Sequence, residues 1–394
     1  MKKALSALLA VFVALSAGGC SPVNIWADYR ETEDLELIRV LGVDSADQSV
    51  TVTAGTGEWA DGEESRIIMQ RAENLPAALN CLRCDPVGRE PCFTHTEYLV
   101  VGEELAREGL GGLLDYVERM STLRLKTGLF IVRGGSAESA ISACAGERSS
   151  AADMLKYISA NVELMGLGSV YSCGSVAASL ADDGLALVQA VAVGGSGGTE
   201  GDFILKPLGY AAFRDGKLLC YFEGAEAAAL SVLTGRVKSM GMSAEPEDGS
   251  RAVMELRGFH VRVSPRWEEA GLAAVRVDIE AKAGLTQMSG GADIEAKAVR
   301  RALERRLAGQ LEELTERTIV RTQALGCDFA GLGGMLDRRC PGKFASVRVD
   351  WASIYPNLDI TVSARVELDR TFEITSTPAS AVYGDERGNV DAVR

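Results

Sequence analysis

The second half of the chain carries its clearest hydrophobic pattern. Across residues 275–285 every second position is apolar, and charged residues occupy most of the positions between them. This period of two is typical of a β-strand with one face buried and the other in water. Residues 254–263 alternate in the same way, with a slip at Gly258 that indicates a β-bulge. The runs 346–351 and 358–368 also alternate and predict two more strands.

Between these strands, residues 292–325 show the spacing of a long helix. One apolar stripe runs along it, formed by Leu303, Leu307, Leu311 and Leu314, while Glu and Arg occupy many other positions. Such a stripe indicates packing against a core more often than a seam for a partner helix. The second half is therefore predicted to be an antiparallel sheet packed on a long α-helix.

Strands and helices alternate in the first half. Residues 37–44 and 49–57 predict two strands, and the short runs 97–102 and 127–134 predict buried ones. A helix is predicted to follow Asn74, which can cap its first turn. This order indicates a mixed α/β N-terminal region. The expected fold class is α+β, with that region followed by the sheet and long helix.

The expected domain organisation follows from these patterns and from composition. The glycine-rich run GGSGGTEGD resembles a flexible connection and matches no phosphate-binding fingerprint. We expect a signal peptide at 1–19, an N-terminal domain of one or two subdomains at 20–193, a linker at 194–202, a C-terminal domain at 203–376 and a flexible tail at 377–394.

The start of the chain has the three parts of a signal peptide. Lys2 and Lys3 precede an uncharged apolar run, and small residues stand immediately before Cys20. The apolar run is too short for an ordinary transmembrane helix. A cysteine directly after the cleavage site predicts lipidation of Cys20, with a cleaved and freely secreted protein as the alternative.

The charge balance restricts the partners. The chain has 55 acidic and 41 basic side chains and a formal net charge of −14. This charge argues against nucleic acid as a partner, and against binding an anionic membrane by charge alone. A membrane location would therefore depend on covalent lipid. Apart from the diacylglycerol and acyl lipid on Cys20, no cofactor is expected.

One cluster of metal-ligating residue types stands out. Cys81 and Cys84 are followed closely by Cys92 and His95, a Cys₃His set that can bind structural zinc. Outside the cytoplasm, a disulfide or free thiols among these cysteines is the favoured alternative. The chain has two histidines in all and no Gly-x-Ser-x-Gly motif, so nucleophilic catalysis is not expected and the chain is predicted not to be an enzyme.

Four blocks of sequence, in the same order, resemble the Ger(x)C family. They are WADYRETEDLELIRVLGVD, EYLVVGEELAREGLGGLLDYVERM, FRDGKLLCYFEGAEAAALSVLTGRVKS and TQALGCDFAGLGGMLDRRCPGKF. In the last block, Gln323, Asp328, Gly331 and Gly333 match the family's Gln, Asp and paired Gly. The chain departs from the family at Phe344, where tryptophan is usual, and at Tyr355, where phenylalanine usually precedes the proline.

This resemblance implies a non-enzymatic lipoprotein, the C subunit of a spore nutrient germinant receptor. Such a subunit is held by lipid on the outer face of the spore inner membrane, acts by protein–protein contact, and has two integral-membrane subunits as partners. The resemblance assigns a structural role to the four matched residues of the last block. The alternative from another class is an extracytoplasmic solute-binding lipoprotein that captures a small molecule between its two domains.

Overall fold

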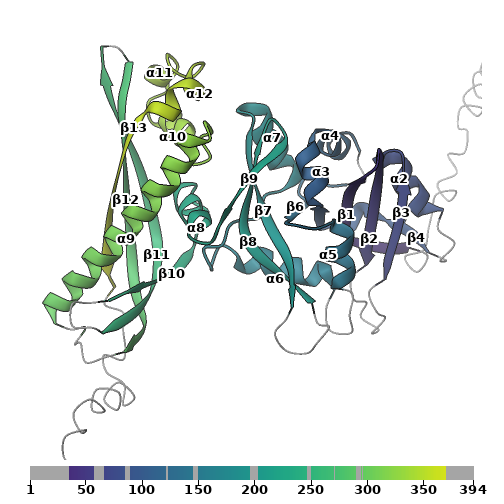
Figure 1. Ribbon diagram of the computed structural model, residues 1–394, viewed down its shortest axis with the longest axis horizontal. Helices are drawn as coiled ribbons and strands as arrows, with labels where there is room; N and C mark the ends of the chain where they lie inside the picture. Colours follow the sequence, from purple (N-terminus) through teal and green to yellow (C-terminus); the bar gives the residue numbers. More distant parts are fainter. Residues whose placement is uncertain are drawn as a thin grey trace, which may run out of the picture.

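The chain folds into two sheets with helices packed on both (Figure 1). The structure is a computed structural model that describes residues 35–56, 66–84, 89–120, 123–144, 150–195, 203–245, 250–269, 271–289, 294 and 296–369. The predicted signal peptide, Cys20 and the predicted tail at 377–394 lie outside the described residues. The α+β class is confirmed, and the two sheets define a first and a second lobe.

The first lobe is built on a nine-stranded sheet within the described ranges. Eight strands follow the order β3-β2-β1-β5-β6-β7-β8-β9, and β4 pairs with β1 beside this path. β1, β5, β6 and β7 run parallel, and antiparallel strands complete both ends. The strands are β1 Leu35–Ala46, β2 Ser49–Thr56, β3 Ile67–Ala72, β4 Glu90–Cys92, β5 Tyr98–Val101, β6 Gly128–Val132, β7 Leu185–Gly195, β8 Phe203–Arg214 and β9 Lys217–Glu223.

Helices cover both faces of this sheet. One buried cluster joins the sheet to α2, α3, α4 and α7, and another joins its opposite face to α5 and α6. Strands of a sheet that is covered on both faces are apolar at successive positions, which explains why every residue of β5 is buried. The helices are α2 Leu75–Arg83, η2 Phe93–His95, α3 Glu103–Glu108, α4 Gly111–Arg119, α5 Ala137–Ala143, α6 Ala151–Asn161 and α7 Cys173–Asp182.

The start of α2 confirms the predicted cap. Asn74 Oδ1 accepts a hydrogen bond from Ala77 N at 2.9 Å, and Pro76 lies in the first turn. Proline is tolerated there because the first N–H groups of a helix have no partner inside the helix.

The second lobe contains a four-stranded sheet in the order β10-β11-β12-β13. The alternation predicted for residues 275–285 is confirmed, and the pairing of β11 with β12 shifts between Arg257 and His260, where Gly258 has a φ of 64°. The strands are β10 Ser239–Ala244, β11 Arg251–Glu268, β12 Gly271–Ser289 and β13 Asp359–Leu368. The helices are α8 Gly224–Leu233, α9 Lys297–Ala324, α10 Leu332–Arg339, α11 Pro341–Phe344, α12 Trp351–Ile354 and η3 Tyr355–Asn357.

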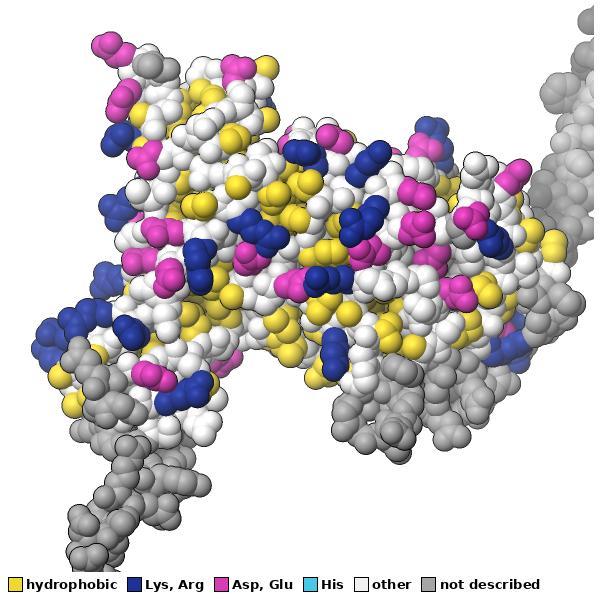
Figure 2. Space-filling view, viewed as in Figure 1, with side chains coloured by type: hydrophobic (Ala, Val, Ile, Leu, Met, Phe, Trp, Pro, Cys, Tyr) yellow, Lys and Arg dark blue, Asp and Glu magenta, His cyan; other side chains and the backbone are white. Residues whose placement is uncertain are grey.

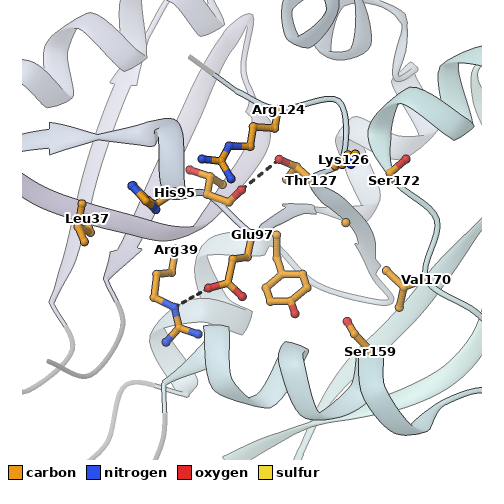
Figure 3. A pocket seen from close by; sticks show the side chains of 13 residues that line it. Leu37, Arg39, His95, Glu97, Arg124, Lys126, Thr127, Ser159, Val170 and Ser172 are labelled. Atoms are coloured by element: carbon orange, nitrogen blue, oxygen red, sulfur yellow. Dashed lines mark hydrogen bonds and ion pairs between the residues drawn. The ribbon is translucent and has the colours of Figure 1, made fainter. Parts of the chain in front are cut away.

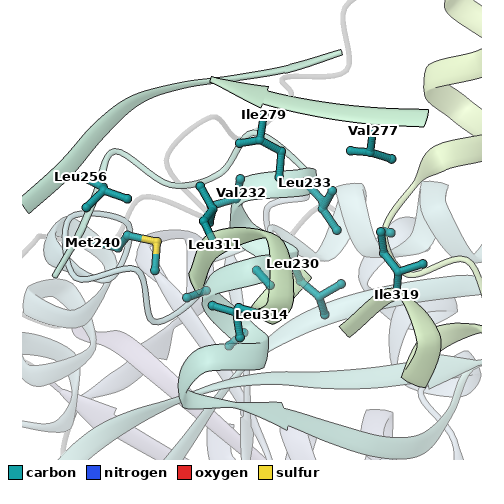
Figure 4. Packing of buried hydrophobic residues seen from close by; sticks show 14 of the residues in the cluster. Leu230, Val232, Leu233, Met240, Leu256, Val277, Ile279, Leu311, Leu314 and Ile319 are labelled. Carbon is teal, nitrogen blue, oxygen red and sulfur yellow. The ribbon is translucent and has the colours of Figure 1, made fainter. Parts of the chain in front are cut away.

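The long helix α9 packs its leucine stripe against this sheet, as predicted. Leu303, Leu307, Leu311 and Leu314 are buried in one cluster with Val277 and Ile279 of β12. Residues 227–233 of α8 are all buried, and Figure 4 shows Leu230, Val232 and Leu233 packed in the same cluster as Leu311 and Leu314. Tyr210 and Phe222 of the first sheet also belong to this cluster. The core of the second lobe therefore extends onto β8 and β9.

Two predictions for the second half are wrong. β13 runs parallel to β12, because α9 spans 28 residues, about 42 Å, and returns the chain to the starting end of the sheet. Residues 346–351 form turns and the start of α12. In this region the side chains that pack against the core are Phe344, Val347 and Trp351, which have a helical spacing, whereas Val349 is 92% exposed.

The predicted linker 194–202 does not separate the two lobes. Gly194 and Gly195 lie in β7, which pairs antiparallel with β8 along its length, and residues 196–202 lie outside the described residues. The segment thus joins two neighbouring strands of one sheet. The division between the sheets falls after β9, because β8 and β9 complete the first sheet.

The free edge of β13 is covered by side chains of α9. Glu312 Oε1 accepts from Ala364 N at 2.8 Å, Glu304 Oε1 accepts from Leu368 N at 3.1 Å, and Arg300 donates to Leu368 O at 3.1 Å. The two glutamates are about 12 Å apart along the helix, and their partners about 13 Å apart along the strand. The carboxylates therefore match the spacing of the outward N–H groups.

Basic and acidic side chains are interspersed over the face of the molecule in Figure 2. Lys and Arg gather over the first turns of α9, where the sequence has Arg300, Arg301, Arg305 and Arg306. Within the described residues, no helix has the length and apolar character needed to cross a membrane.

Candidate functional site

The carboxyl ends of the parallel strands, where open α/β sheets usually bind ligands, are filled by the protein itself. Asp44 of β1 points its carboxylate at the start of α5, where Oδ1 accepts from Ala137 N at 2.7 Å and Oδ2 from Glu138 N at 2.9 Å. A Cβ atom on Gly102, just after β5, would clash with Asp44 Oδ1. Burial raises the pKa of Asp44, although the two N–H groups oppose the shift. This carboxylate therefore acts as a helix cap.

We expect Asp44→Ala to lower the free energy of unfolding by about 1–2 kcal/mol, because two backbone N–H groups of α5 lose their acceptor. Asp44→Asn retains one acceptor oxygen and should cost less than Asp44→Ala. Urea unfolding followed by circular dichroism measures both variants, with the exposed Glu108→Ala as control. Equal stability of Asp44→Ala and the control would contradict the capping role.

A cavity of about 680 Å³ lies at the opposite, amino ends of β1, β5 and β6 (Figure 3). It belongs to the first lobe, whereas the solute-binding alternative expects a ligand between two domains. Its lining comes from β1, the segment before β5, the loop before β6, α6 and the segment before α7. The lining residues are Leu37, Arg39, His95, Thr96, Glu97, Tyr98, Arg124, Lys126, Thr127, Gly128, Ser159, Val170 and Ser172.

One wall of this cavity is held by ion pairs of Arg39. The guanidinium donates from Nε to Glu97 Oε1 at 3.0 Å and from Nη1 to Asp153 Oδ1 at 2.9 Å. Burial alone would lower the pKa of Arg39, but the two carboxylates raise it. Burial alone would raise the pKa of Asp153, but hydrogen bonds from Ser150 and Arg39 bring it below its usual value. Arg39 thus links β1 to α6.

The floor of the cavity is buried and closely packed. Tyr98 and Phe130 meet edge to face with ring centroids 5.7 Å apart. Thr127 Oγ1 donates to Thr96 O at 3.1 Å, which ties the loop before β6 to the segment before β5. A Cβ atom on Gly128 would lie 3.1 Å from Val170 Cγ1, so this position has little room for a side chain.

The predicted cysteine and histidine set is spread over several elements. Cys81 lies on α2 and Cys84 at its end, both exposed, whereas Cys92 ends β4 and has its Sγ 3.1 Å from Thr94 Oγ1. His95 ends η2 and lines the cavity. Among the residues that the structure describes, no three His, Cys, Asp or Glu side chains are grouped to hold a metal, and the cysteines are unpaired.

The four matched residues of the last sequence block are brought together after α9. Asp328 is half-buried; its Oδ1 accepts from Leu332 N at 3.0 Å, and its Oδ2 from Gly333 N at 2.7 Å and from Trp351 Nε1 at 3.0 Å. Burial raises the pKa of Asp328 to about 6, although all three donors oppose the shift. Asp328 therefore connects the start of α10 to α12.

The other three residues shape the same junction. Gln323 Nε2 donates to Tyr355 O at 2.9 Å and to Leu358 O at 2.8 Å. Gly331 has a φ of 70°, which disfavours residues with a Cβ, and a Cβ atom on Gly333 would lie 2.6 Å from Trp351 Nε1. The buried Tyr355 hydroxyl is 2.6 Å from Thr322 Oγ1. We call this set the Asp328 junction, and its hydrogen bonds give it a structural role.

Reasoning from the sequence missed the cavity residues Arg39, Arg124 and Lys126. They come from a strand and a loop separated by more than 80 positions, and no motif or period links them. Only His95 among the lining residues was a candidate beforehand, and for a different kind of site.

Two family models match the chain, one after the other. "Spore germination protein N-terminal domain" matches residues 28–188, and "Spore germination B3/ GerAC like, C-terminal" matches residues 208–372. A solved structure titled "Crystal Structure of the GerBC protein" superposes with a TM-score of 0.55 at 16% identity, covering 83% of this chain and 96% of that one. At this identity the likeness concerns the fold. No curated protein sequence matches the chain.

Proposed function

The chain belongs to the Ger(x)C family of spore germination proteins, and from this premise we propose that it is the lipid-anchored C subunit of a germinant receptor. The observation that carries the proposal is the succession of the two family models, which together account for residues 28–188 and 208–372 in the expected order. The GerBC-like fold of both lobes supports it.

Lipid on Cys20 is the proposed link to the membrane. Cys20 precedes the first strand residue, Leu35, by 15 positions, and an extended segment of that length spans at most about 50 Å. The folded body would therefore remain close to the membrane surface. Its net charge of −14 favours covalent attachment over attraction to anionic lipids.

The proposed mode of action is contact with two integral-membrane subunits, without catalysis. The carboxylates of Asp44 and Asp328 accept hydrogen bonds from N–H groups of the protein's own helix starts. Such carboxylates hold elements in place and are not poised as acids or bases for a substrate. Their role fits a rigid body that presents surfaces to partners.

Affinity purification tests this function. We expect the full-length chain with a C-terminal tag, solubilised from host membranes in mild detergent, to recover two multi-spanning membrane proteins in stable ratio. The deletion strain should lose its response to the cognate nutrient, and the wild-type gene should restore it. Recovery of the chain alone, together with an unchanged nutrient response in the deletion strain, would refute the proposal.

A further inference from the structure

We propose that the cavity at the amino ends of β1, β5 and β6 binds a small molecule through a phosphate or carboxylate group, with Arg124 and Lys126 holding the anion. This inference goes beyond the proposed lipid at Cys20 and the proposed contact with membrane subunits.

The lining of the cavity is predominantly positive. Three permanent cations, Arg39, Arg124 and Lys126, line the cavity, and Glu97 is the one carboxylate among its lining residues. The lining residues thus carry a local excess of positive charge in a chain whose net charge is −14. A concave site with one sign of charge concentrates ligands of the opposite sign.

The three lining cations differ in whether they have ion-pair partners among the described residues. Arg39 is engaged by Glu97 and Asp153, so it mainly builds the wall. Arg124 and Lys126 are exposed, and within the described residues neither has an ion-pair partner. Figure 3 places both on the same rim of the cavity, with His95 beside Arg124. A planar guanidinium can bind two oxygen atoms of one phosphate or carboxylate, and an ammonium group lining the same cavity adds a second positive charge.

The cavity is large enough for a small molecule and has an apolar part in its lining. A volume of about 680 Å³ is within the range of small-molecule sites and exceeds what a bare phosphate fills. Leu37, Val170 and the ring of Tyr98 supply apolar surface below the cations. The expected ligand therefore combines an anionic group with an apolar or aromatic portion.

Two sources could provide this chemistry. One is a soluble metabolite that carries a phosphate or carboxylate. The other is the headgroup of an anionic phospholipid, which the proposed lipid at Cys20 would bring near, since β1 begins the described chain and contributes Leu37 and Arg39 to the cavity. The experiment separates the two.

The test uses the mature chain from position 20 with Cys20→Ser, released from a cleavable secretory signal, so that neither lipid nor the apolar segment 4–19 obscures membrane binding. Phenyl phosphate is titrated by calorimetry, and co-sedimentation compares phosphatidylglycerol vesicles with phosphatidylcholine vesicles. The cavity variant is Arg124→Gln with Lys126→Gln. The control is Arg338→Gln with Arg339→Gln, which removes the same charge from exposed positions on α10.

We expect the cavity variant to bind at least about 10-fold more weakly than the wild type, while the control remains within about 2-fold, because each lost charge-assisted hydrogen bond reduces affinity by about 10-fold or more. Arg124→Lys should retain part of the affinity. Loss confined to phenyl phosphate indicates a soluble ligand, and loss confined to phosphatidylglycerol vesicles indicates a headgroup.

Matching thermal unfolding of the two double variants shows that both are folded, and the exposure of all four side chains favours this result. The proposal is overturned if the wild type binds neither probe, or if the cavity and control variants weaken binding equally. Either result leaves the receptor proposal untouched, since that proposal depends on partner recovery and germination.

Discussion

Incorporation of alkyne palmitate will fall to background when Cys20 is replaced by alanine. The proposed modification places a diacylglyceryl group on the Cys20 sulfur, and each buried CH₂ contributes about 0.8 kcal/mol to membrane binding. Two long chains therefore suffice for stable attachment. The matched control is Cys84→Ala, an exposed cysteine on the folded body that should retain full labelling.

The same variant should also leave the membrane. Because an unprocessed chain would retain its apolar segment 4–19, the Cys20→Ala chain is expressed behind a secretory signal that is cleaved without lipid. We then expect it in the soluble fraction after carbonate washing, with the lipidated wild type in the pellet. Pelleting of the variant, or an unmodified thiol at the amino terminus of the mature wild type by mass spectrometry, would exclude the lipid proposal.

Asp328→Ala should cost about 3 kcal/mol of unfolding free energy at pH 5. The substitution leaves Leu332 N, Gly333 N and Trp351 Nε1 without their acceptor in a buried position, at about 1 kcal/mol or more each. Urea unfolding followed by circular dichroism measures the loss. Asp350→Ala is the control, because Asp350 is exposed and its side chain does not cap α12.

The cost of Asp328→Ala should depend on pH. Burial raises the pKa of Asp328 from its ordinary value to about 6, so the folded state holds this proton more tightly than the unfolded state. The stability that Asp328 contributes therefore falls as pH rises through 6. We expect the cost to be about 1–2 kcal/mol smaller at pH 8 than at pH 5. A cost that grows with pH would mean that the three donors outweigh burial.

Elements with a regular period could be predicted from the sequence alone. The leucine stripe of α9 and the alternation of β12 both follow from one buried face, and each lies where the pattern placed it. Strand direction has no such signal, because a side-chain pattern is the same for parallel and antiparallel pairing. The direction of β13 depends on the length of α9. The first sheet continues to β9 because β7 and β8, which lie on either side of residues 196–202 in the sequence, pair with each other.

The candidate sites also differ in how much of each could be predicted from the sequence. The residues of the Asp328 junction were found through a family resemblance, and their hydrogen bonds could not be derived from spacing, since Asp328 and Trp351 are 23 positions apart. The cavity had no sequence signal. Arg39 and Arg124 line the same cavity only because β1, β5 and β6 begin side by side. Sites that arise from strand order require the structure.

The glutamates of α9 that cover β13 have a consequence for crowding. Many copies tethered to one bilayer would collide often, and an open strand edge would let the sheets of neighbouring copies pair edge to edge. At β13, an incoming chain would first have to displace Glu304 and Glu312 from the N–H groups they occupy. This flank of the second lobe is thereby kept from self-polymerising, which leaves specific docking to other surfaces.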